Sequence, residues 1–416
     1  MIKLLGFFSL IMIFVAGSVL AENDGRIYSK ITTTDGDILE GLIRWDKNEG
    51  SWVDILNGTK DLSNKKSKKY SETDRRKQNR NKETSIEIFG ISLGKTSSSN
   101  WTLFNSAQSG IRFGHIKSLE PIGDDRALLV LKSGEEVELF GGSTDIGNGI
   151  REIIIEDEEE GEVELLWDDI ELIEFMPANN NDESMFGERL YGTLTTRRGD
   201  EFTGFVCWDV DELFGTDILD GDEDGRDRKI KFGKIKSIER YSSNGATIVL
   251  TSGDELLLKN SNDIDDGNRG IIISDPGFGQ IVIMWDDFDK LIFSEAPHQV
   301  KYSDFDGGHP LMGTVYSEDG ESYTGQIRWD DDEEYSWEIL DGDYHDIEFD
   351  IEFGLIKKIE KKSQRTSIIT TLDGRTFRLR GSNDVDSDNK GIFIETSADD
   401  EVKLDWDEFS YVEFKK

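Results

Sequence analysis

The chain has 416 residues, of which 87 are Asp or Glu and 48 are Lys or Arg, so its formal net charge is −39. Such a surface repels nucleic acid and anionic lipid and suits cations, basic partners or simple solubility. Apolar residues make up 36% and aromatic residues 10% of the chain, which is too many for a disordered acidic tail. The length requires several domains, and the single cysteine, Cys207, excludes a disulfide within the chain.

The first 21 residues have the pattern of a Sec signal peptide. Lys3 precedes an apolar run, and Val19 and Ala21 stand at the cleavage positions. We therefore expect an exported, periplasmic or extracellular chain that starts near Glu22 and keeps no transmembrane anchor. The alternative is an uncleaved anchor, for which the apolar run is short.

Three similar segments follow. GTLTTRRGDEFTGFVCWD (192–209) matches GTVYSEDGESYTGQIRWD (313–330), and KITTTDGDILEGLIRWD (30–46) matches both. The recurrence of these matching segments along the chain predicts an array of three tandem repeats, each about 105–150 residues long. The predicted parts are a signal peptide (1–21), unit 1 (26–176) with a basic insertion (59–110), a linker (177–188), unit 2 (189–294), a linker (295–309) and unit 3 (310–416).

Each unit is predicted to be all-β. Apolar and polar residues alternate with a period of two, Val, Ile, Thr, Phe and Trp dominate the runs, and no stretch has a helical period with caps. Each unit also divides into two halves. A hairpin around a Gly turn opens each half, and an apolar strand, a tight turn and a last strand close it.

The same layout resembles small SH3-like or Sm-like barrels. The matching residues are a DG pair followed by Gly five positions later, as in Gly36 and Gly41, and a closing I-x-F-x-x-I pattern, as in IRFGHI from residue 111. The resemblance implies two such barrels in each unit, a class that binds peptides, nucleic acid or subunits through loops and exposed edges. Neither the Sm-type RNA-binding motif nor the SH3 aromatic groove is recognisable, so the resemblance assigns no functional residue.

The insertion in unit 1 is basic in an otherwise acidic chain. Residues 60–84 hold ten Lys or Arg against four Asp or Glu. Their low apolarity predicts a disordered, solvated loop. The functional alternative is contact with a polyanion, with anionic lipid headgroups or with an acidic face of another copy. The rest of the insertion contains short pieces that predict an added hairpin.

Six Trp-Asp pairs recur at equivalent positions. A Trp on the inward face of a small barrel fills a core that has few other large residues, and this is the favoured interpretation. The alternative is a ladder of exposed rings that stack on sugars. The tryptophans are Trp45, Trp167, Trp208, Trp285, Trp329 and Trp406.

One acidic loop has the oxygen-ligand spacing of a calcium site. Asp384, Asp386, Asp388 and Glu395 take positions 1, 3, 5 and 12 of an EF-hand loop, although Asn389 replaces the glycine of position 6. Units 1 and 2 lack the full set. All three units keep an Asp followed six residues later by a cation, which favours a structural turn over a metal site. These pairs are Asp145 with Arg151, Asp263 with Arg269 and Asp384 with Lys390.

No catalytic motif is present. The four histidines have no metal-ligand spacing, and no nucleophile elbow, P-loop or dinucleotide glycine pattern occurs. We therefore predict an exported, non-catalytic binding or structural module whose partner is a protein or an envelope component. The alternatives are a calcium-binding repeat protein and a glycan-binding or carbohydrate-active protein.

Overall fold

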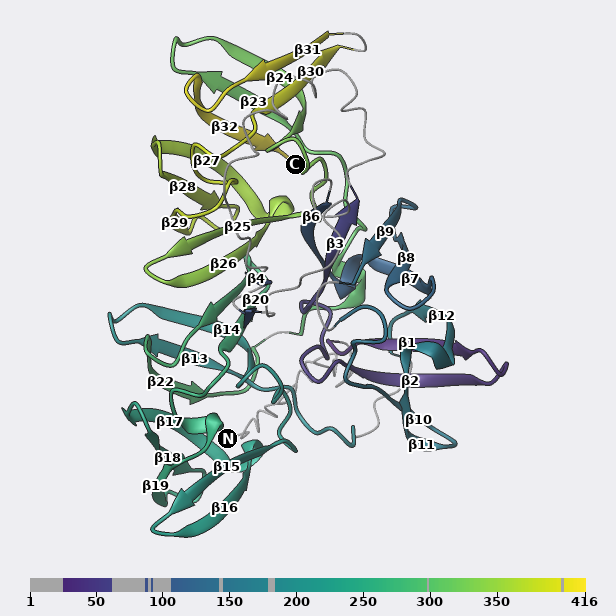
Figure 1. Cartoon of the computed structure of the whole chain (residues 1–416), viewed down its shortest axis with the longest axis vertical. Coiled ribbons are helices and arrows are strands. Elements are labelled where there is room, and N and C mark those ends of the chain that lie inside the picture. The colour runs from purple at the N-terminus through teal and green to yellow at the C-terminus, as the bar shows by residue number, and fades with distance from the viewer. Residues whose placement is uncertain are drawn as a thin grey trace, which may run out of the picture.

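The computed structural model describes residues 25–61, 87–88, 91–92, 106–141, 145–178, 184–297, 299–397 and 400–416. They form antiparallel sheets joined by turns, and the all-β class predicted from the sequence is confirmed (Figure 1). Single-turn 3-10 helices precede several strands. These are η3 (Phe113–His115), η4 (Trp167–Asp169), η5 (Phe232–Lys234), η6 (Asn262–Ile264), η7 (Tyr302–Asp304) and η8 (Phe353–Leu355).

Two sequence predictions fall outside these residues. The signal peptide (1–21) is one, and the basic segment 60–84 is the other, except for Lys60 and Asp61. A short antiparallel hairpin, β4 (Glu87–Ile88) with β5 (Ile91–Ser92), does lie in the insertion, as predicted. Among the described residues, no helix has the length and apolar character needed to cross a bilayer.

The first sheet has ten strands in the order β11-β10-β2-β1-β12-β7-β8-β9-β3-β6. Side chains alternate between buried and partly exposed along its strands, for example through β8, as the period of two predicts. The strands are β1 (Tyr28–Thr33), β2 (Ile38–Trp45), β3 (Ile55–Asp61), β6 (Ser106–Arg112), β7 (Ile116–Pro121), β8 (Arg126–Leu131), β9 (Glu136–Phe140), β10 (Ile153–Asp157), β11 (Gly161–Leu165) and β12 (Ile170–Phe175).

The second sheet has twelve strands in the order β16-β15-β19-β18-β17-β22-β13-β14-β20-β21-β26-β25. Its first ten strands, from β16 to β21, correspond one by one to the first sheet from β6 to β11. The strands are β13 (Tyr191–Thr196), β14 (Glu201–Cys207), β15 (Ile218–Glu223), β16 (Arg226–Lys231), β17 (Ile235–Ser242), β18 (Gly245–Leu250), β19 (Glu255–Lys259), β20 (Ile271–Asp275), β21 (Gly279–Ile283), β22 (Phe288–Phe293), β25 (Ile339–Tyr344) and β26 (Ile347–Glu352).

The third sheet has eight strands in the order β29-β28-β27-β32-β23-β24-β30-β31. Two further strands, β25 and β26, would complete the ten-strand order. β25 meets the chain just past β29 through a bridge between Asp343 and Arg380, but β26 pairs with β21, so both strands join the second sheet instead. The strands are β23 (Met312–Ser317), β24 (Ser322–Arg328), β27 (Ile356–Ser363), β28 (Thr366–Thr371), β29 (Thr376–Leu379), β30 (Ile392–Ser397), β31 (Asp400–Leu404) and β32 (Phe409–Lys415).

The two halves of each segment exchange their hairpins. In the third segment, the opening hairpin β23–β24 pairs with β32 and β30 of the second half, whereas the hairpin β28–β29 pairs with β27 of the first half. The sequence predicts two halves side by side along the chain. The structure instead interleaves them, because the alternation of apolar residues marks the buried face of a strand but not its neighbour.

The sheets are open. Each has two terminal strands that do not pair with each other, so no strand order among the described residues closes into a barrel. Residues of the second and third segments share one continuous hydrophobic core. The first segment has a core of its own, to which Tyr302, Phe305 and Trp337 from farther along the chain contribute.

The six tryptophans of the Trp-Asp pairs lie in these cores, and none is more than 3% exposed. Trp208 packs edge-on against Trp285 and Trp329 against Trp406, with 6.3 Å between ring centroids in both pairs. The core interpretation of these residues is therefore confirmed. Their indoles help to fill cores that are otherwise made mainly of Ile, Leu, Val and Phe.

Candidate functional site

Three acidic turns recur at the ends of β2, β14 and β24, and each follows a buried Trp. The sequence pattern is Trp-Asp-x-x-Glu, and the two residues after the Trp have positive φ in all three turns, for example 49° at Asp209 and 57° at Val210. Two consecutive left-handed residues reverse the chain tightly, and Asp tolerates this conformation better than most residues. The backbone of residues 208 and 212 pairs across the turn.

A second segment packs under each turn and supplies another Asp. The indole nitrogens of Trp45, Trp208 and Trp329 donate to the backbone carbonyls of Asp145, Asp263 and Asp384, at 3.0, 2.7 and 3.0 Å. The carboxylates of these aspartates accept from the backbone amides of residues 57, 220 and 341, at 2.7, 2.6 and 3.0 Å. Each Asp thus links its loop to the strand hairpin above it.

A cation from the same loop forms an ion pair with the first Asp of each turn. The Arg269 backbone donates to Asp209 Oδ1 at 2.6 Å, and its guanidinium lies 2.8 Å from Asp209 Oδ2 and also contacts Asp211. Arg151 lies 3.2 Å from Asp46 and Lys390 lies 3.3 Å from Asp330 in the other two turns. The sequence predicted that this cation pairs with the Asp of its own loop. The structure places it against the Asp of the Trp-Asp pair instead.

Among the residues that the structure describes, no cation forms such an ion pair with the glutamate that ends each pattern. One carboxylate oxygen, Oε2, is buried in Glu49, Glu212 and Glu333, and within the described residues it meets no hydrogen-bond donor. Burial raises the pKa of all three carboxyls, and the charges of neighbouring aspartates add to this effect; the pKa of Glu212 rises to about 10. Burial and the neighbouring carboxylates thus favour the neutral form of each glutamate over its charged form.

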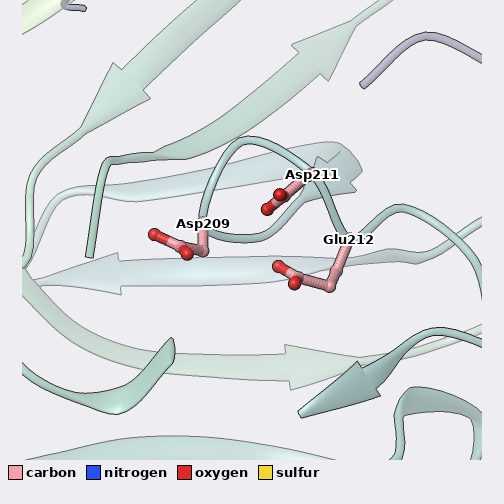
Figure 2. Close-up of side chains that lie close together, drawn as sticks. All are labelled: Asp209, Asp211 and Glu212. Carbon is pink, nitrogen blue, oxygen red and sulfur yellow. The ribbon is translucent and has the colours of Figure 1, made fainter. Parts of the chain in front are cut away.

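Asp209, Asp211 and Glu212 lie together in the second turn (Figure 2). Ligand oxygens from all three come within 4.8 Å of one another, a compact carboxylate group. Such oxygens suit a hard cation. However, the Arg269 guanidinium already contacts both Asp209 and Asp211, so the protein supplies a cation of its own at this position.

The four predicted calcium ligands do not gather in this way. Asp384 is buried, Asp386 is half-buried, and Asp388 and Glu395 are exposed. Asp386 Oδ1 accepts from the Asp388 backbone at 2.9 Å, and Glu395 lies on β30 opposite Glu401. Among the described residues, these four are not part of any set with the closeness of the Asp209 group. The calcium loop stays a prediction, and the contacts of Asp384 are those of a structural turn.

We expect Asp384→Ala to lower the free energy of unfolding by about 1–3 kcal/mol, because it removes a buried carboxyl and leaves the Asp341 backbone amide without this acceptor. Asp384→Asn should remain close to the unchanged protein. The asparagine side chain has the same shape, and its amide oxygen can still accept from the Asp341 backbone amide. Urea unfolding of both variants with and without calcium checks this, and a calcium-dependent difference would contradict the structural role.

A cavity of about 630 Å³ lies where the first and third segments meet the linker 295–309. Its lining includes Arg112, His115, Phe305, His309 and Glu352. Arg112 Nε lies 3.3 Å from Glu352 Oε2, and His115 Nε2 lies 3.4 Å from Glu352 Oε1. The Gly307 backbone donates to His115 Nδ1, which leaves the proton of a neutral ring on Nε2, facing Glu352.

The charged groups of this cavity hold segments together. Arg112 also donates to the carbonyls of Asp275 at 3.1 Å and Pro276 at 3.5 Å, so it contacts the second segment as well as the third. Burial raises the pKa of Glu352, but the charge of Arg112 and the His115 ring outweigh it and leave the pKa lowered. Arg112 and Glu352 are 2% and 6% exposed, so this is a buried, compensated ion pair.

Cys207 is not a nucleophile of either region. It is buried in β14, and burial raises the pKa of its thiol well above the usual value. The sequence analysis did not predict the buried glutamates or the ion pair between Arg112 and Glu352. The Trp-Asp-x-x-Glu pattern, which occurs three times, could have indicated the buried glutamates.

Comparison of the chain with protein-family models, with curated proteins and with solved structures finds no match. The interpretation of these sites therefore depends on their own geometry.

Proposed function

We propose that the chain is an exported, non-catalytic binding or structural module of the periplasm or cell envelope. The observation that carries this proposal is that the recurring charged side chains bind one another. The Arg269, Asp209 and Asp211 cluster and its counterparts are closed by internal ion pairs, and the cavity is lined by the compensated pair of Arg112 and Glu352. Charged groups that are paired internally in this way stabilise a scaffold and are not available to bind a substrate.

We propose further that the three segments are copies of one unit and that each copy combines two small SH3-like or Sm-like sheets. The matching strand orders support this proposal, as do the equivalent contacts of the three acidic turns. In each copy one sheet would consist of the outer strands, such as β1, β2 and β10 to β12, and the other of the inner strands β3 and β6 to β9.

Export and partner binding are tested together. We expect the chain made in a bacterial host to begin at Glu22 and to occur in the exported fraction, because residues 1–21 have the signal-peptide pattern. The purified exported chain should then retain an envelope component saturably, with equal yield in calcium and in chelator. A chain that stays in the cytoplasm with residues 1–21 attached would contradict the proposal.

Calcium binding is the second candidate, and the observation that favours it is the carboxylate group of Asp209, Asp211 and Glu212. Millimolar calcium occupies comparable extracellular sites. A rise in Tm with calcium that Glu212→Gln abolishes would establish this function in place of the internal ion pair.

Two other proposals meet constraints from the described residues. A glycan-stacking surface needs exposed indoles, yet Trp52, Trp337 and the six tryptophans of the Trp-Asp pairs are buried, and Trp101 lies outside the described residues. Polyanion contact through residues 60–84 stays a proposal. Lys60 is unsuited to it, because its Nζ contacts Glu338 and the residue is only 7% exposed.

A further inference from the structure

One strand junction inside the chain joins two segments edge to edge. β21 of the second segment pairs antiparallel with β26 of the third, with Gly279 opposite Ile351, Gln280 opposite Asp350, and Val282 opposite Glu348. The Gln280 amide donates to the Asp350 carboxylate at 3.0 Å. The junction makes one sheet from parts of two segments, so this fold joins its units by pairing strand edges.

The same two kinds of edge remain open elsewhere. β31 is the third segment's counterpart of β21 and is a terminal strand of its sheet; β16 is the second segment's counterpart of β26 and is also terminal. Asp400, Glu401 and Lys403 are exposed on β31, and all of β16 except Ile230 is exposed. Figure 1 shows the two edges at opposite ends of the long axis, with β30 and β31 at the top and β15 and β16 at the bottom.

We propose that β31 of one copy pairs with β16 of a second copy in the register of β21 with β26, giving a head-to-tail assembly of this chain. This inference rests on the proposed structural function and names its partner. Transferring the register places Glu401 opposite Lys229 and Lys403 opposite Asp227. Both directly opposed pairs have opposite charges, which stabilises antiparallel neighbours.

β11, the first segment's counterpart of β21, is also a terminal strand, but it fits β16 less well. In the same register Glu162 faces Lys229, but Glu164 faces Asp227, and like charges directly opposite each other are unfavourable. β11 does keep a glycine, Gly161, at the position of Gly279, where a Cβ would lie 1.9 Å from the Asp350 carbonyl oxygen.

On β31 the residue at this glycine position is Asp400. A β-bulge between Glu395 and Ser397 changes this end of the β30–β31 hairpin, so the proposed pairing begins at Glu401. From there the two matched charge pairs favour β31 over β11.

The assembly is expected to be weak and dependent on concentration. The internal junction has an aromatic cluster in which Phe349 packs against Phe278 and Phe377, with ring centroids 6.0 and 4.9 Å apart. At the position of Phe349, β16 carries Arg228, so the second copy brings charge rather than an apolar anchor. High salt should therefore weaken the contact.

Charge reversal tests the register in the purified exported chain. Reversing one strand, as in Asp227→Lys with Lys229→Glu, should weaken association by about tenfold in sedimentation velocity, and so should Glu401→Lys with Lys403→Glu. Mixing the two variants, or combining all four changes in one chain, should restore association, because opposite charges again face each other. Equal association of all forms, or no self-association of the unchanged chain at any concentration and at low salt, would overturn the proposal.

Cysteine pairs test the strand partners. Arg228→Cys with Val402→Cys in one chain should give a ladder of disulfide-linked copies on oxidation, because these positions face each other in the proposed register. Val402→Cys alone should give no dimer, and a dimer would assign a symmetric β31 contact instead. A ladder from Arg228→Cys with Val163→Cys would assign β11. Envelope retention is measured separately, so loss of self-assembly with retained envelope binding would reject this inference and leave the proposed function intact.

Discussion

Arg112→Met is expected to lower the free energy of unfolding at pH 7 by about 3–5 kcal/mol, because it leaves the buried Glu352 carboxylate without its cation. The direction of the pKa shift of Glu352 determines how its contribution to stability changes with pH. The folded pKa of Glu352 is lowered, so this group stabilises the fold above its unfolded pKa and loses that contribution as the pH falls. Without Arg112 burial prevails and raises the pKa. The difference between the two proteins should therefore be largest at neutral pH and shrink below about pH 4.5, where the lost hydrogen bonds of Arg112 to Asp275 and Pro276 remain.

Two controls separate the charge from the lost side-chain contacts. Arg112→Met with Glu352→Gln should recover a large part of the loss, since no charge is then buried alone. Lys231→Met changes the same repeat position in the second segment, where the side chain is exposed on β16, and should alter stability by about 0.5 kcal/mol or less. Urea unfolding from pH 4 to 8 measures all three variants. A double variant no more stable than Arg112→Met would contradict the ion-pair argument.

The strands and buried faces were readable from the sequence, whereas the pairing of the hairpins was not. The period of two identifies Trp208 and Trp329 as core residues, and both are fully buried. The same pattern does not predict which strand pairs with each edge of a hairpin. The opening hairpin β23–β24 could pair with either half of its segment, and long-range packing selects β30 and β32.

The cavity shows a second limit of sequence reasoning. Arg112, Lys231 and Glu352 occupy the same position of the three segments, in IRF, IKF and IEF. Opposite charges at one repeat position hint at a contact between copies, but only the arrangement of the segments decides which two meet. The acidic loop of Asp384 shows the converse case. Its spacing suggested a metal, while burial and the backbone amide of Asp341 give the carboxylate a structural partner.

Glutamine in place of Glu49, Glu212 or Glu333 is expected to stabilise the chain above neutral pH. Burial raises the folded pKa of each carboxyl, so the folded chain keeps a proton that the unfolded chain releases near pH 4.5. The stabilising contribution is complete below that pH and is lost as the pH rises toward the folded pKa, by up to about 1.4 kcal/mol per pH unit and group. Glutamine removes the loss, because it is neutral at every pH.

Each single variant should therefore match the unchanged protein near pH 4.5 and exceed it by about 1–3 kcal/mol at pH 8 in urea unfolding. Glu255→Gln, on the exposed side of β19, is the matched control and should give a curve parallel to that of the unchanged protein.

The same measurement decides between the internal ion pair and calcium at the second turn. A bound cation would hold Glu212 ionised, so Glu212→Gln would then cost stability in calcium. A gain in both calcium and chelator leaves Arg269 as the cation of this site.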